Sequence, residues 1–99
     1  MDHTLSGDDV EITDALRAHV GEKLARLDGQ GTETTRVQVT LKVNGSEQTA
    51  TGTLLQVDGQ DLTPITAAAS DMFVAIDKLA DKLYAQVRRH TQREYGRPK

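Results

Sequence analysis

The sequence predicts an α+β fold with the element order β-α-β-β-β-α, in which one face of a four-stranded mixed sheet carries both helices. Residues 36–43 alternate between apolar and polar side chains, which is typical of a half-buried strand. Two glycine-containing turn signals follow and indicate hairpins. The segments on either side of these strands each carry one apolar stripe at helical spacing. Because each helix has a single stripe to bury, both are expected to pack on the same face of the sheet.

The first strand and the first helix are predicted from short local patterns. Residues 1–6 alternate loosely, with His3 and Leu5 on one face, and indicate a strand. Thr13 suits a helix N-cap, because its hydroxyl can accept a hydrogen bond from a free backbone N–H group. The apolar stripe that follows consists of Leu16, Val20, Leu24 and Leu27. Residues 28–31 (DGQG) end this predicted helix.

The middle of the chain is predicted to form an antiparallel meander. After the strand at 36–43, Asn44-Gly45 is the preferred pair for a type I′ turn. The return strand covers about 48–57, and a bulge at Leu54-Leu55 would restore its inward face. Asp58-Gly59 indicates a second hairpin turn before a strand at 62–68. Since Pro64 cannot donate to a ladder, that strand is expected at a sheet edge. The first β-α-β step is expected to be a parallel crossover.

A long final helix completes the predicted fold. Ser70 or Asp71 is expected to cap it, and its apolar stripe consists of Met72, Ile76, Leu79, Leu83 and Val87. Gly96 and Pro98 should stop it near Tyr95. The chain has 99 residues, so we expect a single domain over 1–95 followed by a flexible basic tail at 96–99.

Composition and motifs exclude most enzyme classes. The chain has no cysteine, and its three histidines are scattered and form no metal-binding motif such as H-E-x-x-H. His19 is expected on the solvent side of the first helix. Neither a nucleophile elbow nor a phosphate-binding glycine loop is present. We therefore expect no enzymatic activity, metal, cofactor or small-molecule substrate. No apolar run approaches the length of a membrane span, and residues 1–20 lack a signal-peptide core, so a cytoplasmic protein without membrane contact is expected.

The charge distribution points to a polyanionic partner despite a net charge of −3. On the last helix, Lys78, Lys82, Arg89 and Arg93 fall within about 60° of one another, beside the apolar stripe. Arg88 projects elsewhere, and Asp77 and Asp81 point away from the four cations. The cations of the first helix, Arg17, Lys23 and Arg26, are spread around its polar side.

Two helices on one sheet face would place these cations on a shared outer surface, which suits the phosphates of folded RNA read by shape. Aromatic residues make up only 3% of the chain, which argues against base-stacking platforms. A solvated helix face is the alternative interpretation of the same charges.

Three runs of the sequence resemble a known family. Residues 7–17 (GDDVEITDALR), 22–27 (EKLARL) and 71–83 (DMFVAIDKLADKL) are similar to the helix signatures of the ribosome hibernation promoting factors, in their short form. This family is also called ribosome-associated inhibitor A or sigma-54 modulation protein. The resemblance covers roughly residues 2–93. It implies a fold akin to the double-stranded-RNA-binding domain, no enzymatic activity, and a role in silencing idle ribosomes under stress.

The resemblance also implies partners and contact residues. The partner would be the small ribosomal subunit near the mRNA and tRNA decoding region, with a separate ribosome modulation factor as a candidate second partner. The residues that would contact 16S rRNA are Arg17, Lys23, Arg26, Lys78, Lys82, Arg88 and Arg89, and the stripe adds Arg93. The alternative is a protein-binding regulator, such as a modulator of a sigma factor, that acts through the sheet face or edge. The acidic amino-terminal half favours that alternative, whereas the aligned cations disfavour it.

Overall fold

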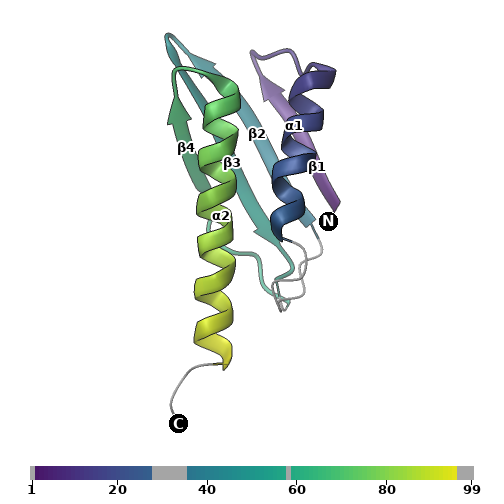
Figure 1. Cartoon of the computed structure of the whole chain (residues 1–99), viewed down its shortest axis with the longest axis vertical. Coiled ribbons are helices and arrows are strands. Elements are labelled where there is room, and N and C mark those ends of the chain that lie inside the picture. Colours follow the sequence, from purple (N-terminus) through teal and green to yellow (C-terminus); the bar gives the residue numbers. More distant parts are fainter. Residues whose placement is uncertain (1, 28–35, 58, 96–99) are drawn as a thin grey trace.

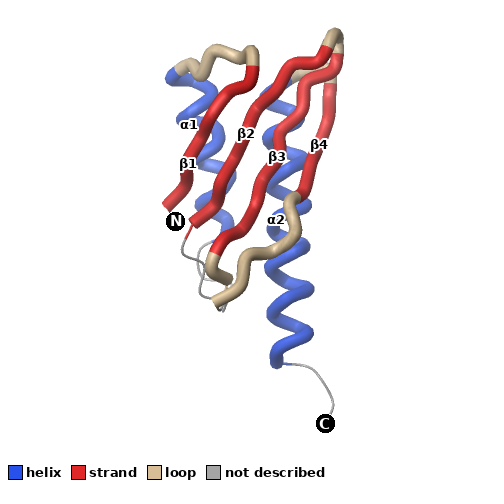
Figure 2. The backbone as a smooth tube through the Cα atoms, turned by 180° about the vertical axis from the view of Figure 1, so that it is seen from behind, coloured by secondary structure: helices blue, strands red, loops and turns tan. Residues whose placement is uncertain are grey.

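The computed structural model describes residues 2–27, 36–57 and 59–95, with side chains to residue 90. Its sheet consists of β1 (Asp2–Asp8), β2 (Arg36–Asn44), β3 (Glu47–Leu55) and β4 (Ile65–Ala69), in that spatial order. β1 pairs in parallel with β2, and the other neighbours are antiparallel. The helices are α1 (Asp14–Leu24), extended by a 3-10 turn (Ala25–Leu27), and α2 (Met72–Tyr95). Both helices cover one face of the sheet (Figures 1 and 2), which confirms the predicted fold.

The alternation in β2 sorts its side chains between the core and the open face. Val37, Val39 and Leu41 are buried beneath the helices, and the residues between them point to the open face of the sheet. Hydroxyl groups line much of that face, as in the cross-strand pairs Ser6–Thr40 and Thr51–Thr66. The core therefore lies entirely between the sheet and the two helices.

Both helices begin with the caps that the sequence indicates. The backbone N–H of Leu16 donates to Thr13 Oγ1 at 3.1 Å, and the backbone N–H of Phe73 donates to Asp71 Oδ1 at 2.7 Å. Asp71, rather than Ser70, therefore caps α2. All residues of the two predicted stripes are buried, as expected.

Gly52 allows α2 to lie close to the sheet. A Cβ atom at this position of β3 would lie 3.0 Å from Leu83 Cδ1 and 3.2 Å from Leu79 Cδ2. Those two leucines are among the largest fully buried side chains of the core. Glycine in the middle of a strand usually marks such a close approach.

The first hairpin turn lies one residue later than predicted. Asn44 pairs with Glu47, so the two loop residues are Gly45 and Ser46. Only Gly45 has a positive φ, of 66°, which is the pattern of a turn with glycine at its first central position. The Asn44-Gly45 type I′ prediction is therefore wrong.

The predicted bulge at Leu54-Leu55 is also wrong. The ladder continues without interruption, because Leu54 pairs with Val37 and Leu55 with Arg36. The break in alternation is resolved after the strand, where Gln56 adopts a φ of 60°. This left-handed residue returns the next side chain, Val57, to the core, where it is fully buried.

β4 starts later than the sequence pattern suggests. A backbone bond from the Leu62 N–H to the Leu54 carbonyl, 2.8 Å long, joins the preceding segment to β3. Pro64 has no N–H group, and the regular ladder begins at Ile65. The edge position of β4 is confirmed. The second hairpin turn joins Val57 to Gln60 through two backbone hydrogen bonds. Three predicted features lie outside the described residues, namely the helix end at 28–31, Asp58 and the tail at 96–99.

Candidate functional site

The cations of α1 face carboxylates of α2. Arg26 Nη1 donates to Asp81 Oδ1 at 2.7 Å, and Lys23 Nζ lies 3.6 Å from Asp77 Oδ1. His19 Nε2 shares that same Asp77 oxygen at 2.7 Å. Asp77 and Asp81 do point away from the α2 stripe, as the helical angles predict, and the structure shows that they bind the other helix instead.

His19 does not lie on the solvent side of α1. Its side chain is only 22% exposed, and its ring packs edge-on against Phe73 at a centroid distance of 5.1 Å. The hydrogen bond to Asp77 holds the ring between the two helices. The expectation from the sequence was wrong because α2 covers this part of α1, a contact that the periodicity of one helix does not reveal.

Tyr84 lies between two arginines of the interhelical region. The Arg26 guanidinium carbon is 5.1 Å from the ring centroid, and that of Arg88 is 6.0 Å from it, both within the range of cation–π contacts. Arg26 follows α1 and Arg88 belongs to α2, so the Tyr84 ring contacts a cation from each helical segment. Asp81 binds Arg26 as well, which keeps that guanidinium close to α2. We call Lys23, Arg26 and Arg88 the interhelical cluster.

Arg17 stands apart from this cluster, on the exposed part of α1, nearly two turns before Lys23. Among the described residues, no carboxylate lies within 4.0 Å of its side chain.

The cations on the other side of α2 are exposed and carry no acidic partner. Lys78, Lys82 and Arg89 form the α2 stripe, and within the described part of the chain no carboxylate lies within 4.0 Å of any of them. Lys82 Nζ donates to the Thr66 carbonyl of β4 at 3.2 Å, which directs this stripe toward the sheet edge. Arg93 belongs to α2, but its side chain lies outside the described residues.

The predicted site residues therefore form two sets instead of one continuous surface. The interhelical cluster lies between α1 and α2, and its charge is partly compensated by Asp77 and Asp81. The α2 stripe lies on the flank of α2 that is turned toward β4, and no carboxylate of the described residues lies within 4.0 Å of its cations. A cation that is already paired must give up part of that interaction before it can bind another anion, and this cost applies to the interhelical cluster.

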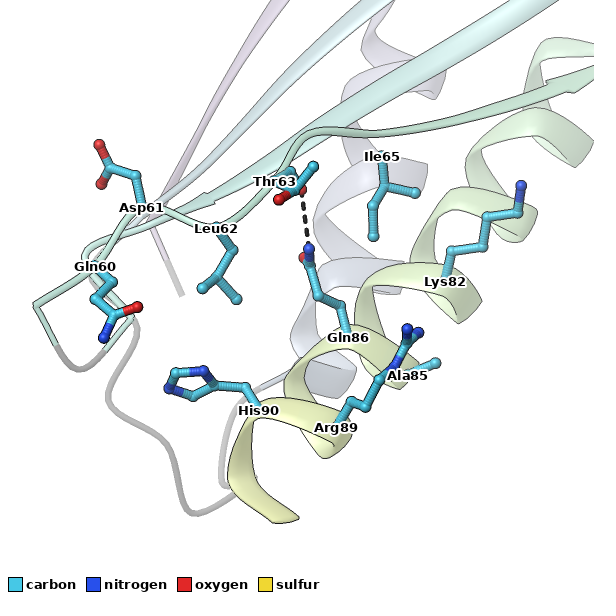
Figure 3. A pocket seen from close by; sticks show the side chains of 10 residues that line it. All are labelled: Gln60, Asp61, Leu62, Thr63, Ile65, Lys82, Ala85, Gln86, Arg89 and His90. Carbon is cyan, nitrogen blue, oxygen red and sulfur yellow. Dashed lines mark hydrogen bonds between the residues drawn. The ribbon is translucent and has the colours of Figure 1, made fainter. Parts of the chain in front are cut away.

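A pocket adjoins the α2 stripe. It measures about 640 Å³ and lies between α2 and the connection from β3 to β4, with Lys82 and Arg89 among its lining residues (Figure 3). Gln86 Nε2 donates to the Thr63 carbonyl across it at 2.9 Å. His90 also lines the pocket and is only 9% exposed.

Over 2–27, 36–57 and 59–95, no group of three or more histidine, aspartate or glutamate side chains is arranged to hold a metal ion. In the same ranges, no helix combines the length and the apolar character needed to cross a membrane.

Comparison with known proteins identifies the family. The family described as Sigma 54 modulation protein / S30EA ribosomal protein matches residues 4–94. The chain belongs to this family. The ribosome hibernation promoting factor of Pseudomonas putida is 40% identical over 94 residues, which cover 95% of this chain and 90% of that protein. The ribosome hibernation promoting factor of Escherichia coli is 39% identical over 90 residues, covering 91% and 93%.

A solved structure of the family has the same fold. The Protein Y N-terminal domain of Thermus thermophilus superposes with a TM-score of 0.81 at 34% identity, and the match covers 91% of this chain and 99% of that domain. The sequence resemblance to the ribosome hibernation promoting factors is thereby confirmed.

Sequence reasoning missed three features of this S30EA family member. The Asp81–Arg26 and Asp77–Lys23 pairs join residues more than 50 positions apart, and a single-helix projection cannot place them together. Tyr84 belongs to no sequence motif, but its spacing of four residues from Arg88 places both side chains on the same side of α2. The pocket depends on the path of residues 60–65, for which the sequence offers no periodic signal.

Proposed function

We propose that this protein is a ribosome hibernation factor of the cytoplasm that binds the small ribosomal subunit and silences or preserves idle ribosomes under stress. Its membership of the S30EA family supports this role, and the relatives with about 40% identity over most of their length are ribosome hibernation promoting factors. The α2 stripe is the observation that carries the molecular part of the proposal, because three exposed cations, with no carboxylate of the described residues within 4.0 Å, form a ridge suited to RNA phosphates.

The proposed contact is with 16S rRNA near the mRNA and tRNA decoding region. Lys78, Lys82 and Arg89 bind phosphates directly, and Arg93 extends the ridge along the same helix. The interhelical cluster and Arg17 supply a second row of contacts from the other side of α2. A separate ribosome modulation factor is a second candidate partner. The protein acts by occupying its site, with no chemical step and no cofactor.

Charge reversal on the α2 stripe tests the proposal. Replacing Lys82→Glu and Arg89→Glu together should lower affinity for purified small subunits by more than about a hundredfold, since two phosphate contacts become repulsions. The matched control is Arg36→Glu with Lys42→Glu, which makes the same charge change on the open face of the sheet. Lys42 lies 3.8 Å from Asp8 in an exposed pair, so its loss should cost little stability. Equal binding by both double variants, with unchanged circular dichroism melts, would contradict the assignment.

The salt dependence separates RNA from protein as the partner. With six to eight phosphate contacts, each contributing a log–log slope of about −0.7 to −0.9, affinity should fall by roughly three orders of magnitude between 50 and 200 mM monovalent salt. A nearly flat response would instead favour the alternative function, a regulator that docks another protein on the open sheet face or on the β1 or β4 edge.

A further inference from the structure

The pocket beside the α2 stripe has an uneven distribution of charge. Lys82 and Arg89 line its α2 side, and Leu62 and Ile65 supply apolar surface on the opposite wall (Figure 3). Its volume of about 640 Å³ is within the usual range for small-molecule sites. The pocket thus offers cations on one side and apolar contact on the other, whereas the Asp61 carboxylate points away from the pocket and accepts from Gln56 (Figure 3).

Hydrogen bonds fix the wall opposite α2. Val57 and Gln60 exchange two backbone bonds of 2.6 and 3.0 Å, and the Gln56 N–H donates to Asp61 Oδ1 at 3.1 Å. Gln86 Nε2 ties the Thr63 carbonyl to α2 at 2.9 Å. A wall held at several points needs little reorganisation when a ligand binds, which lowers the entropic cost of binding.

We propose that this pocket binds a single ribonucleotide, whose phosphate is held by Lys82 and Arg89. Arginine and lysine provide the charge-assisted donors that phosphate oxygens accept. The flat face of the base would lie on Leu62, Ile65 and Ala85, which line the pocket. The proposal rests on the proposed function, because it gives two cations of the RNA-binding stripe a specific ligand.

A ribonucleotide explains features of the pocket that simpler anions leave unexplained. Inorganic phosphate would need only the two cations, and the apolar surface of the pocket would not favour it. A continuous duplex would contact the exposed ridge of α2 from outside. An unpaired nucleotide can enter a pocket, and proteins recognise RNA bases most specifically where they are unpaired. The nucleotide can belong to a ribosomal RNA chain or be free in solution, and the chemistry of recognition is the same.

Nuclear magnetic resonance titration of the isolated protein tests the pocket directly. Adenosine and guanosine 5′-monophosphate should shift the backbone amides of residues 61–63, 65 and 85–89, with dissociation constants of about 1 mM for such small ligands. Inorganic phosphate and ribose 5-phosphate should bind at least about tenfold more weakly. Equal responses to phosphate and nucleotides, or no response at residues 61–63 and 65, would overturn the proposal.

A steric variant separates the pocket from the charge. Ala85→Phe fills the pocket from an exposed helix position and retains both cations, so it should abolish the nucleotide response. Ala85→Leu is a smaller filler in case the phenylalanine lowers the melting temperature. The matched control is Ala68→Phe, an exposed alanine of β4 on the open face of the sheet, which should retain the full response. Retained nucleotide binding in both Ala85 variants would overturn the assignment to this pocket.

Small-subunit binding by the same variants identifies the source of the nucleotide. If Ala85→Phe also weakens ribosome binding at least tenfold, the ligand is a nucleotide of the RNA chain. If ribosome binding is unchanged while the mononucleotide response is lost, the pocket takes a free nucleotide. Failure of the wild-type protein to bind small subunits would reject the proposed function, but the titration of the isolated protein would still decide whether the pocket binds ribonucleotides.

Discussion

Neutralising Asp81 should strengthen RNA binding. In the free protein its carboxylate accepts a 2.7 Å bond from Arg26, and Arg26 also packs on Tyr84. A phosphate that binds Arg26 must share it with this carboxylate and is repelled by it. Asp81→Asn retains the shape and an acceptor oxygen for Arg26 but removes the negative charge.

The expected magnitude follows from the exposure of the pair. The side chains of Arg26 and Asp81 are 48% and 68% exposed, so the ion pair contributes at most about 1 kcal/mol to stability. Its loss should lower the melting temperature of a domain of this size by less than about 8 °C. Repulsion between a carboxylate and a phosphate about 4 Å away in water is also about 1 kcal/mol, and it decreases with distance. The variant should therefore bind small subunits up to about fivefold more tightly.

Fluorescence anisotropy with labelled protein and purified small subunits can measure this gain at several salt concentrations. The gain should shrink as salt rises, because the effect is a screened repulsion at an exposed site. Glu47→Gln is the matched control, since it removes one exposed carboxylate at the β2–β3 hairpin, which lies at the other end of the sheet from the C-terminal end of α1 (Figure 1). Weaker binding by Asp81→Asn, or an equal gain in Glu47→Gln, would refute a role for Asp81 in restraining the interhelical cluster.

Three further changes test the packing, the capping and the orientation of the protein. Gly52→Ala should destabilise the fold by about 1–3 kcal/mol in urea unfolding, because the added Cβ would press on Leu79 and Leu83. A stability equal to that of the wild-type protein would mean that α2 shifts freely on the sheet. Thr13→Ala should cost about 1 kcal/mol by removing the cap on α1, and Thr13→Ser should restore most of it. Replacing Asp8→Asn and Asp9→Asn together should raise nonspecific RNA binding in filter assays without strengthening small-subunit binding. Asparagine tolerates the φ of 60° at position 9, so the backbone should be retained. An unchanged nonspecific affinity for RNA would contradict this expectation.

The fold was predictable because its strongest local signals agree with its tertiary packing. The alternation at 36–43 and the two helical stripes each have one buried face, and those faces meet in one core. The errors lie where backbone conformation overrides side-chain pattern. The break in alternation at Leu54-Leu55 suggests a bulge, but the positive φ at Gln56 restores the inward direction of the next side chain instead. The hairpin loop lies at Gly45-Ser46 because the register of β2 against β3 determines its position, whereas the Asn44-Gly45 dipeptide does not.

The site was predictable only in part. Helical angles correctly grouped Lys78, Lys82 and Arg89 and excluded Asp77 from that face, because those relations lie within one helix. The contacts of Asp77 with His19 and Lys23 depend on how α1 packs against α2, and their residues are far apart in the sequence. The pocket depends on a nonrepetitive connection, whose path is determined by individual hydrogen bonds.

The distribution of charge between the two layers explains how an acidic chain can bind a polyanion in one orientation. Residues 14–27 and 72–90, which form the helical layer, carry seven lysines and arginines against four carboxylates. The described strands and connections carry two cations, Arg36 and Lys42, against seven carboxylates. The helical layer is therefore positive and the sheet layer negative, although the whole chain has a net charge of −3. Approach of RNA to the sheet side is repelled and approach to the helical side is attracted, which favours a defined site over nonspecific coating.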